Sequence, residues 1–125
     1  MKFLLDTHSL LWTIFEPDKL STKAQEIIID HNNIICVSLI SLWEISIKQN
    51  IGRLDIPQEF FEVVSKGGFE MIELTMEQIA KYRTLPLYHR DPFDRMLIVQ
   101  ARQQKLIFIT RDSEISKYDI EIIKA

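Results

Sequence analysis

The chain has 125 residues, of which 46% are hydrophobic and 26% are charged, and its formal net charge is −3 at pH 7. This length allows one domain with a real core and is too short for two, and the composition is that of an ordinary globular protein. The negative charge disfavours simple electrostatic coating of nucleic acid, although bound divalent cations would offset part of it.

The only cysteine, Cys36, lies in the apolar run IICV, so the sequence offers neither a disulfide framework nor a thiolate zinc site. The start, MKFLLD, has too little apolar length for a signal peptide. The longest apolar stretch, around Ile34 to Trp43, falls well short of the ~20 residues that a membrane span needs. These features predict a soluble, cytoplasmic protein with no membrane partner, in which Cys36 is a small core residue.

Strand-like and helix-like segments alternate along the chain. In order, the sequence predicts a strand at 2–6, helices at 7–15 and 21–31, a strand at 34–37, helices at 39–50 and 57–66, a strand at 69–74, helices at 75–84 and 91–105, a strand at 106–110, a short helix at 113–118 and a last strand at 120–123. The segment 85–90 is expected to be the only sizeable irregular loop. This alternation predicts an α/β fold, with a mostly parallel five-stranded sheet covered by helices, in a single domain over 1–125.

Four carboxylates, Asp6, Glu44, Asp94 and Asp112, are spread along the chain. Asp6 and Asp112 lie at or just past the ends of predicted parallel strands, so we expect both at the same edge of the sheet. Carboxylates gathered there would repel each other and would need protons or a cation to coexist. Oxygen ligands of this kind suit Mg²⁺ or Mn²⁺, and such ions can promote phosphodiester hydrolysis.

Each of these acids also has a purely structural explanation. Asp6 and Asp112 both precede helix-like segments and could be N-caps. The run Asp91-Pro92-Phe93-Asp94 is a good helix start in its own right, with a capping aspartate, a proline at N1 and an acid at N3.

Glu44 is the acid that is hardest to explain structurally. Its spacing from Lys48 is that of a weak surface ion pair, worth ~0.3–0.5 kcal/mol. However, it lies in the middle of LISLWEISIK, a helix-like segment with only a narrow polar face. A helix that is so apolar is mostly buried, and a buried acid needs a paired or metal-bound reason to be ionised.

Four segments together resemble a known family. They are LLDTHSLLW at the start, SLISLWEISIKQNIGRL in the middle, and then HRDPFDRMLIVQA and FITRD. In this order, and over nearly the whole chain, they resemble the PIN domain, and more narrowly the VapC-like ribonucleases of type II toxin–antitoxin systems.

The resemblance implies a three-layer α/β/α sandwich whose sheet has the order 3-2-1-4-5. It also implies that Asp6, Glu44, Asp94 and Asp112 surround one or two Mg²⁺ or Mn²⁺ ions. In DPFDRMLI the second aspartate, Asp94, matches the family's metal-site acid, which leaves Asp91 as the helix cap. The implied activity is that of a metal-dependent endoribonuclease, a toxin that blocks translation by cleaving RNA and is held in check by an antitoxin protein.

Further residues are candidates for contacts with the RNA substrate. His8 is next to Asp6 and could position substrate, and Thr110 matches a hydroxyl often found beside the fourth acid of the family. Basic candidates for the phosphates are His89, Arg53 and Arg111, and above all Lys48, Arg90 and Arg95, which flank the site acids. For Trp12 and Trp43, packing in the core or in a homodimer is favoured over stacking on bases.

Two other classes of α/β phosphoryl-transfer domain fit less well. A haloacid-dehalogenase-like phosphatase would need an aspartate two residues after Asp6, where the sequence has His8. A response-regulator receiver would need paired acids near the first strand and a phosphoacceptor aspartate after the third, where Leu74 and Thr75 stand. A non-catalytic PIN-like module that binds RNA or protein stays open as an alternative.

Overall fold

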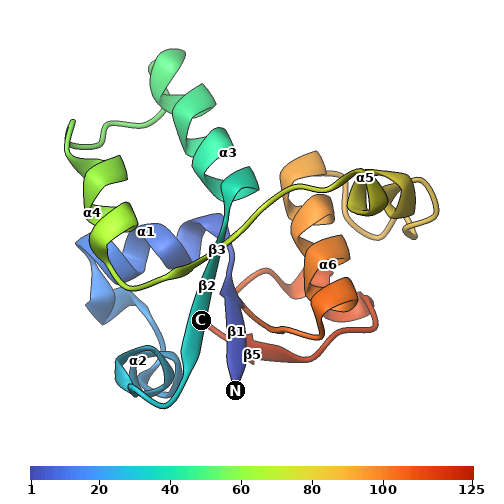
Figure 1. Cartoon of the computed structure of the whole chain (residues 1–125), viewed down its shortest axis with the longest axis horizontal. Coiled ribbons are helices and arrows are strands. Elements are labelled where there is room, and N and C mark those ends of the chain that lie inside the picture. Colours follow the sequence, from blue (N-terminus) through green and yellow to red (C-terminus); the bar gives the residue numbers. More distant parts are fainter.

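The sheet has five strands, all parallel, in the order β3-β2-β1-β4-β5. It is seen in a computed structural model that describes residues 1–125 (Figure 1). The strands are β1 (Lys2–Leu5), β2 (Ile34–Ser38), β3 (Glu70–Ile72), β4 (Ile107–Thr110) and β5 (Ile122–Lys124). The predicted order 3-2-1-4-5 is confirmed.

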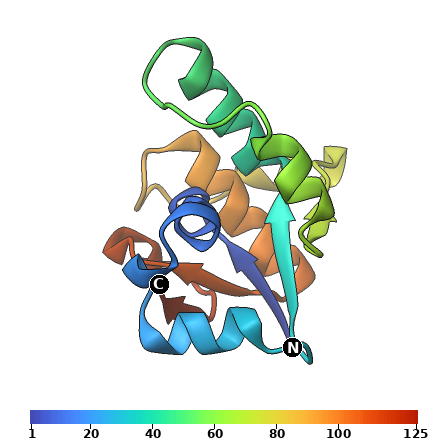
Figure 2. The same cartoon turned by 90° about the vertical axis from the view of Figure 1, so that its left-hand side faces the viewer.

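Helices cover both faces of this sheet and complete the predicted three-layer sandwich. They are α1 (Thr7–Phe15), α2 (Thr22–Ile29), α3 (Leu39–Asn50), α4 (Phe60–Lys66), α5 (Met76–Tyr82) and α6 (Pro92–Gln104), with two 3₁₀ segments, η1 (Pro17–Lys19) and η2 (Ser113–Lys117). Figures 1 and 2 show α1, α2 and α4 on one side and α5 and α6 on the other, while α3 continues from the carboxyl end of β2 beyond the sheet. None of the helices combines the length and the apolar character that crossing a bilayer requires.

The alternation of side chains along the strands divides the core into two clusters, because successive strand residues point to opposite faces. Leu5 of β1 belongs to a cluster of 14 buried residues that also includes Phe60 of α4. Leu4 belongs to a second cluster, of 13 buried residues, with Phe108 of β4 and Leu97 of α6. Both faces of every central strand are therefore buried, which explains why these strands read as continuous apolar runs.

Several element boundaries differ from the sequence-based expectation. The helix expected from Pro57 begins at Phe60, because 57–59 form a turn in which the Pro57 carbonyl accepts a hydrogen bond from the Phe60 N–H (3.1 Å). The segment 51–59 is irregular, so 85–90 is not the only sizeable loop. The expected helix at 113–118 is a 3₁₀ segment, and the third strand covers only 70–72.

The strand order reverses beside β1, since β2 and β3 lie on one side of it and β4 and β5 on the other. In parallel sheets, ligand sites form outside the carboxyl ends of the strands at such a reversal. The ends of β1 and β4 adjoin there and are tied by a hydrogen bond from the Asp6 N–H to the Ile109 carbonyl (3.2 Å). This edge is therefore the place in the fold where functional side chains are expected.

Cys36 gives a test of the core that is independent of function. The thiol is fully buried in β2, and burial, together with its hydrogen bond to Glu70 (3.5 Å), raises its pKa from 9.0 to about 12. The reactive thiolate is thereby reduced ~1000-fold. We predict that iodoacetamide at pH 8 leaves Cys36 of the folded protein unmodified while it alkylates the urea-unfolded chain within minutes, as measured by intact mass. Equal rates in both states would contradict this packing.

Candidate functional site

Asp6 is both a helix cap and a member of the carboxyl-end edge. It follows β1 directly, and its Oδ1 accepts a hydrogen bond from the Ser9 N–H (2.8 Å), which caps α1. Its Oδ2 accepts a hydrogen bond from the hydroxyl of Thr110 (2.6 Å), the last residue of β4. Only 5% of Asp6 is exposed. The predicted N-cap is present, and because a carboxylate oxygen can accept more than one partner, this structural role is compatible with a functional one.

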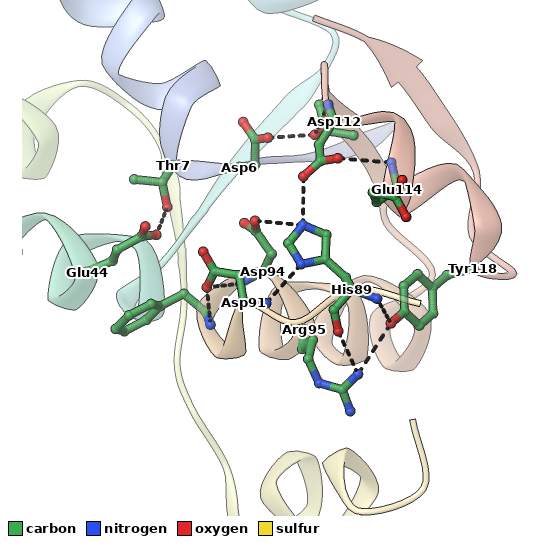
Figure 3. A network of polar contacts seen from close by, with 12 residues as sticks. Asp6, Thr7, Glu44, His89, Asp91, Asp94, Arg95, Asp112, Glu114 and Tyr118 are labelled. Atoms are coloured by element: carbon green, nitrogen blue, oxygen red, sulfur yellow. Dashed lines mark hydrogen bonds and ion pairs between the residues drawn. The ribbon is translucent and has the colours of Figure 1, made fainter. Parts of the chain in front are cut away.

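Glu44 reaches the same region from the middle of α3 (Figure 3). Its Oε1 accepts a hydrogen bond from the hydroxyl of Thr7 (2.6 Å), the residue after Asp6, and its Oε2 forms an ion pair with Lys48 (2.8 Å). Glu44 is only 4% exposed. The burial expected from its apolar surroundings is present, and the partner Lys48 makes it tolerable.

Asp91 and Asp94 have different roles at the start of α6. The Asp91 carboxylate caps the helix by accepting hydrogen bonds from the N–H groups of Phe93 (2.8 Å) and Asp94 (3.4 Å). The Asp94 carboxylate accepts no hydrogen bond from the protein, and its only ion-pair contact is with the His89 imidazole, whose Nε2 is 3.4 Å away. In Figure 3 this carboxylate points toward Asp6 and Asp112.

The environment of Asp94 opposes its ionisation. Burial raises the pKa of this carboxyl from 3.8 to about 7, and the negative charges of Asp91 and Asp6 act in the same direction. The charge of His89 lowers the pKa and that of Glu44 raises it, both by less. The charge of His89 is therefore too weak to offset the burial of Asp94 and the acids around it.

Asp112 is the most exposed of the four acids, with 37% of its side chain accessible. Its Oδ1 accepts a hydrogen bond from the Glu114 N–H (2.9 Å), which caps η2, and its Oδ2 lies 2.7 Å from His89 Nε2. Partial burial alone would raise the pKa of Asp112. The hydrogen bonds from His89 and Glu114, and the charges of His89 and His8, outweigh this and lower it.

The acids fit a hard divalent cation by their chemistry. The donors that face the edge are carboxylate oxygens, the ligands that Mg²⁺ and Mn²⁺ prefer. Atoms of Asp94, Asp112 and His89 lie within 4.8 Å of one another, a spacing compatible with a shared ion. Besides burial, the negative charges of Asp6 and Glu44 raise the pKa of Asp94, and a cation there would relieve this repulsion.

The residues expected at the substrate have different surroundings. Arg90 and His8 are exposed, and the His8 ring stacks on Trp12 with 5.9 Å between centroids. Lys48 is partly exposed but paired with Glu44. Thr110 is 2% exposed and donates a hydrogen bond to Asp6, so it orients this acid and is not accessible to RNA.

Arg95 is not free for the expected contact with RNA. It is 5% exposed, and its guanidinium donates hydrogen bonds to main-chain carbonyls of the loop that precedes α6 and to tyrosine hydroxyls. A guanidinium used in this way is part of the fold. The sequence shows the charge of Arg95 beside Asp94 but not the carbonyls that surround it.

Trp43 does not pack in the core, which was one of the two positions expected for it. It is 59% exposed and makes an edge contact with Phe93 (5.5 Å between centroids), so it is not a core residue. Trp12 is partly buried and packs against the first core cluster.

His89 is the site residue whose position the sequence did not reveal. It was one of several basic candidates for phosphates, yet its ring lies between Asp94 and Asp112. The sequence gives one indication of this position: His89 stands two residues before Asp91, the N-cap of α6, so its side chain can fold back onto the start of that helix.

Known structures share this fold over almost the full length of the chain. A chain of VapBC2 from Rickettsia felis, bound to a promoter DNA fragment, matches with a TM-score of 0.74 at 14% identity, covering 98% of both chains. DNA-bound VapBC from Salmonella typhimurium matches with a TM-score of 0.71 at 19% identity, covering 98% of this chain and 97% of that one. A toxin–antitoxin complex from Klebsiella pneumoniae matches at 0.63 and 17%, covering 98% and 96%.

The sequence comparisons agree with the fold. A search of the curated proteins returns no significant match. The family model of the PIN domain matches residues 3–121, which is nearly all of the chain and includes the four acids at the sheet edge. The chain therefore belongs to the PIN domain family.

Proposed function

We propose that this protein is an endoribonuclease that depends on Mg²⁺ or Mn²⁺ and that the single domain 1–125 carries the activity. The observation that supports it best is Asp94. Its carboxylate faces other acids, has no hydrogen-bond donor, and has a pKa raised to about 7. A partly buried carboxyl of this kind at a parallel-sheet switch point is a feature of functional sites rather than of stable cores.

The four acids have different roles in this proposal. Asp94 and Asp6 hold the cation directly, Glu44 completes the site from α3, and Asp112 binds the ion or a water beside it. The bound ion would supply a water of lowered pKa and would stabilise charge on the phosphate. Thr7 and Thr110 keep Glu44 and Asp6 oriented through hydrogen bonds of 2.6 Å each. Arg90 and His8, which are exposed, would meet the RNA directly, and Lys48 would reach it only from its ion pair with Glu44.

We also propose that this nuclease is the toxin of a cytoplasmic toxin–antitoxin pair that blocks translation. The support is the motif resemblance together with the matched structures, which are described as VapBC and toxin–antitoxin complexes. The expected regulator is accordingly an antitoxin protein that covers the acidic edge. The lone, buried Cys36 is compatible with a reducing compartment.

A homodimer is proposed from an exposed apolar surface. A groove of about 370 Å³ lies between α3, α5 and α6, and seven of its eight lining residues are hydrophobic. Trp43 and Ile79, which line it, are 59% and 51% exposed. Apolar surface gathered in this way is typical of a protein interface.

The nuclease proposal predicts that RNA cleavage requires both the cation and Asp94. Excess EDTA should abolish cleavage of a mixed RNA substrate, and Mg²⁺ or Mn²⁺ should restore it. Asp94→Asn and Asp6→Asn should each reduce the rate at least ~100-fold, since the ion contributes several kcal/mol to the barrier. The matched control is Asp30→Asn, at an exposed aspartate that precedes β2 and so lies at the amino ends of the strands, opposite the four acids. Cleavage that persists in EDTA would refute the mechanism, and cation binding without cleavage would favour the non-catalytic alternative.

Asp94 also predicts a pH-dependent loss of stability in the metal-free protein. Its pKa is raised in the folded state, so the unfolded chain loses this proton first, and stability falls as the pH rises from about 4 to about 7. Above that range the ionised group costs a few kcal/mol, ~4 at most. In EDTA, Asp94→Asn should therefore raise the Tm several times more at pH 8 than at pH 4.5. An unchanged Tm at pH 8 would show that Asp94 is not destabilising.

The apolar groove predicts a change of oligomeric state. Ile79→Glu places a charge on the proposed interface and should convert a dimer to a monomer, as measured by light scattering after gel filtration. Ile29→Glu is the control, because Ile29 is 73% exposed on α2, away from the groove. If the wild type is already monomeric, or if Ile79→Glu stays dimeric, this face is not the interface.

A further inference from the structure

The loop that leads into α6 is held by a buried arginine. Arg95 Nη1 donates hydrogen bonds to the carbonyls of Pro86 (2.9 Å) and His89 (3.1 Å), and Nη2 donates one to the carbonyl of Leu85 (3.2 Å). Three carbonyls of one loop therefore converge on a single guanidinium. Because Arg95 immediately follows Asp94, the loop is fastened to the helix turn that carries the site acid.

Tyr118 fastens the same loop from the far end of the chain. Its hydroxyl accepts a hydrogen bond from the His89 N–H (2.9 Å) and donates one to the Pro86 carbonyl (2.6 Å). The hydroxyl also accepts a hydrogen bond from Arg95 Nη1 (3.4 Å), and Tyr118 as a whole is only 5% exposed. The backbone of His89 is thus held on both sides, by Arg95 at its carbonyl and by Tyr118 at its N–H (Figure 3).

The His89 ring is in turn oriented by a backbone amide. Its Nδ1 accepts a hydrogen bond from the Asp91 N–H (3.0 Å), so the proton of the neutral imidazole must be on Nε2. That Nε2–H points at Asp112 Oδ2, 2.7 Å away, and Asp94 Oδ2 is 3.4 Å away. His89 is therefore set up as a hydrogen-bond donor to Asp112.

In this tautomer, His89 cannot bind a metal ion through Nε2. An imidazole that binds a cation through Nε2 needs a lone pair there, and it normally donates a hydrogen bond through its other nitrogen. Here the other nitrogen accepts one, from Asp91. Hydrogen bonding is thus sufficient to explain the short spacing between His89, Asp94 and Asp112.

We propose that His89 is a positioning residue of the nuclease site, and that Arg95 and Tyr118 position His89. The role rests on the proposed function. The donor Nε2–H fixes the Asp112 carboxylate on the side that faces Asp94, while the Glu114 N–H fixes its other oxygen. Asp112 is the most exposed of the four acids, so it depends most on such restraint.

The experiment compares Mn²⁺ binding by the full chain with and without this donor. Loss of an outer-shell hydrogen bond typically weakens metal affinity 10–100-fold. His89→Ala should therefore weaken Mn²⁺ binding by this factor in calorimetry. His89→Gln, whose amide nitrogen can take the place of Nε2, should restore affinity to within about 3-fold of the wild type. An unchanged affinity in His89→Ala would overturn the proposal.

Electron spin-echo spectroscopy of bound Mn²⁺ distinguishes positioning from coordination. A positioning His89 leaves the ¹⁴N modulation of the Mn²⁺ signal the same in the wild type and in His89→Ala. An imidazole modulation that is present in the wild type and lost in His89→Ala would make His89 a ligand and overturn the proposal.

The role of Tyr118 in holding the loop is tested by a matched pair of variants. Tyr118→Phe removes the hydroxyl that holds His89 and Pro86 but keeps the ring, and should weaken Mn²⁺ binding in the same direction as His89→Ala. Tyr88→Phe is the control, since the Tyr88 ring packs against Tyr118 and is half exposed. Equal affinities for the two variants would refute the role of Tyr118.

These measurements separate the positioning role from the proposed activity. A wild type that binds Mn²⁺ more tightly than His89→Ala but cleaves no RNA would support the positioning role and refute only the nuclease. A wild type that cleaves RNA in a metal-dependent way, with His89→Ala unaffected in Mn²⁺ affinity, would refute only the positioning role. A wild type that binds no Mn²⁺ would refute both.

Discussion

The parallel pairing of β1 with β4 is the constraint on which the rest of the site depends. It brings together the carboxyl ends of two strands that are a hundred residues apart in the chain, with Leu5 opposite Ile109. The hydroxyl of Thr110 can then reach Asp6, and the chain beyond β4 carries Asp112 to the same edge. An antiparallel β4 would have sent Asp112 to the opposite end of the sheet, and the acids would have had no common surface.

Four carboxylates at one edge concentrate negative charge, and the hydrogen-bond donors that stabilise this charge are unevenly distributed among them. Three of the four acids have a donor on each carboxylate oxygen: Asp6 has Ser9 and Thr110, Glu44 has Thr7 and Lys48, and Asp112 has Glu114 and His89. Asp94 has none, and it is the acid whose pKa is raised. Hydrogen bonds stabilise the ionised form of a carboxyl group and burial beside like charges does the opposite. The fold therefore leaves one uncompensated carboxyl at the centre of the site, which is the arrangement that a cation would complete.

Most of the fold could be predicted from the sequence because it is encoded locally. Apolar runs bounded by capping residues mark the strands and helices, and Asp6 and Asp112 fall where those runs end. The predictions that went wrong depended on partners distant in the chain. Arg95 reads as a free cation beside Asp94, but Tyr118 and the carbonyls of the preceding loop surround it. Similarly, only the fold shows that His89 faces Asp112.

The burial of Arg95 changes how substrate attraction must be explained. The chain has a net charge of −3, and two of the basic residues nearest to the acids are already engaged, Arg95 with the loop and Lys48 with Glu44. The exposed Arg90 is then the nearest uncommitted cation in the sequence, and a single surface charge contributes little to binding a polyanion. On the proposed function, the divalent ion therefore has a second role besides chemistry. It offsets much of the negative charge at the edge of the sheet, because without it the four acids would repel the phosphates of the RNA.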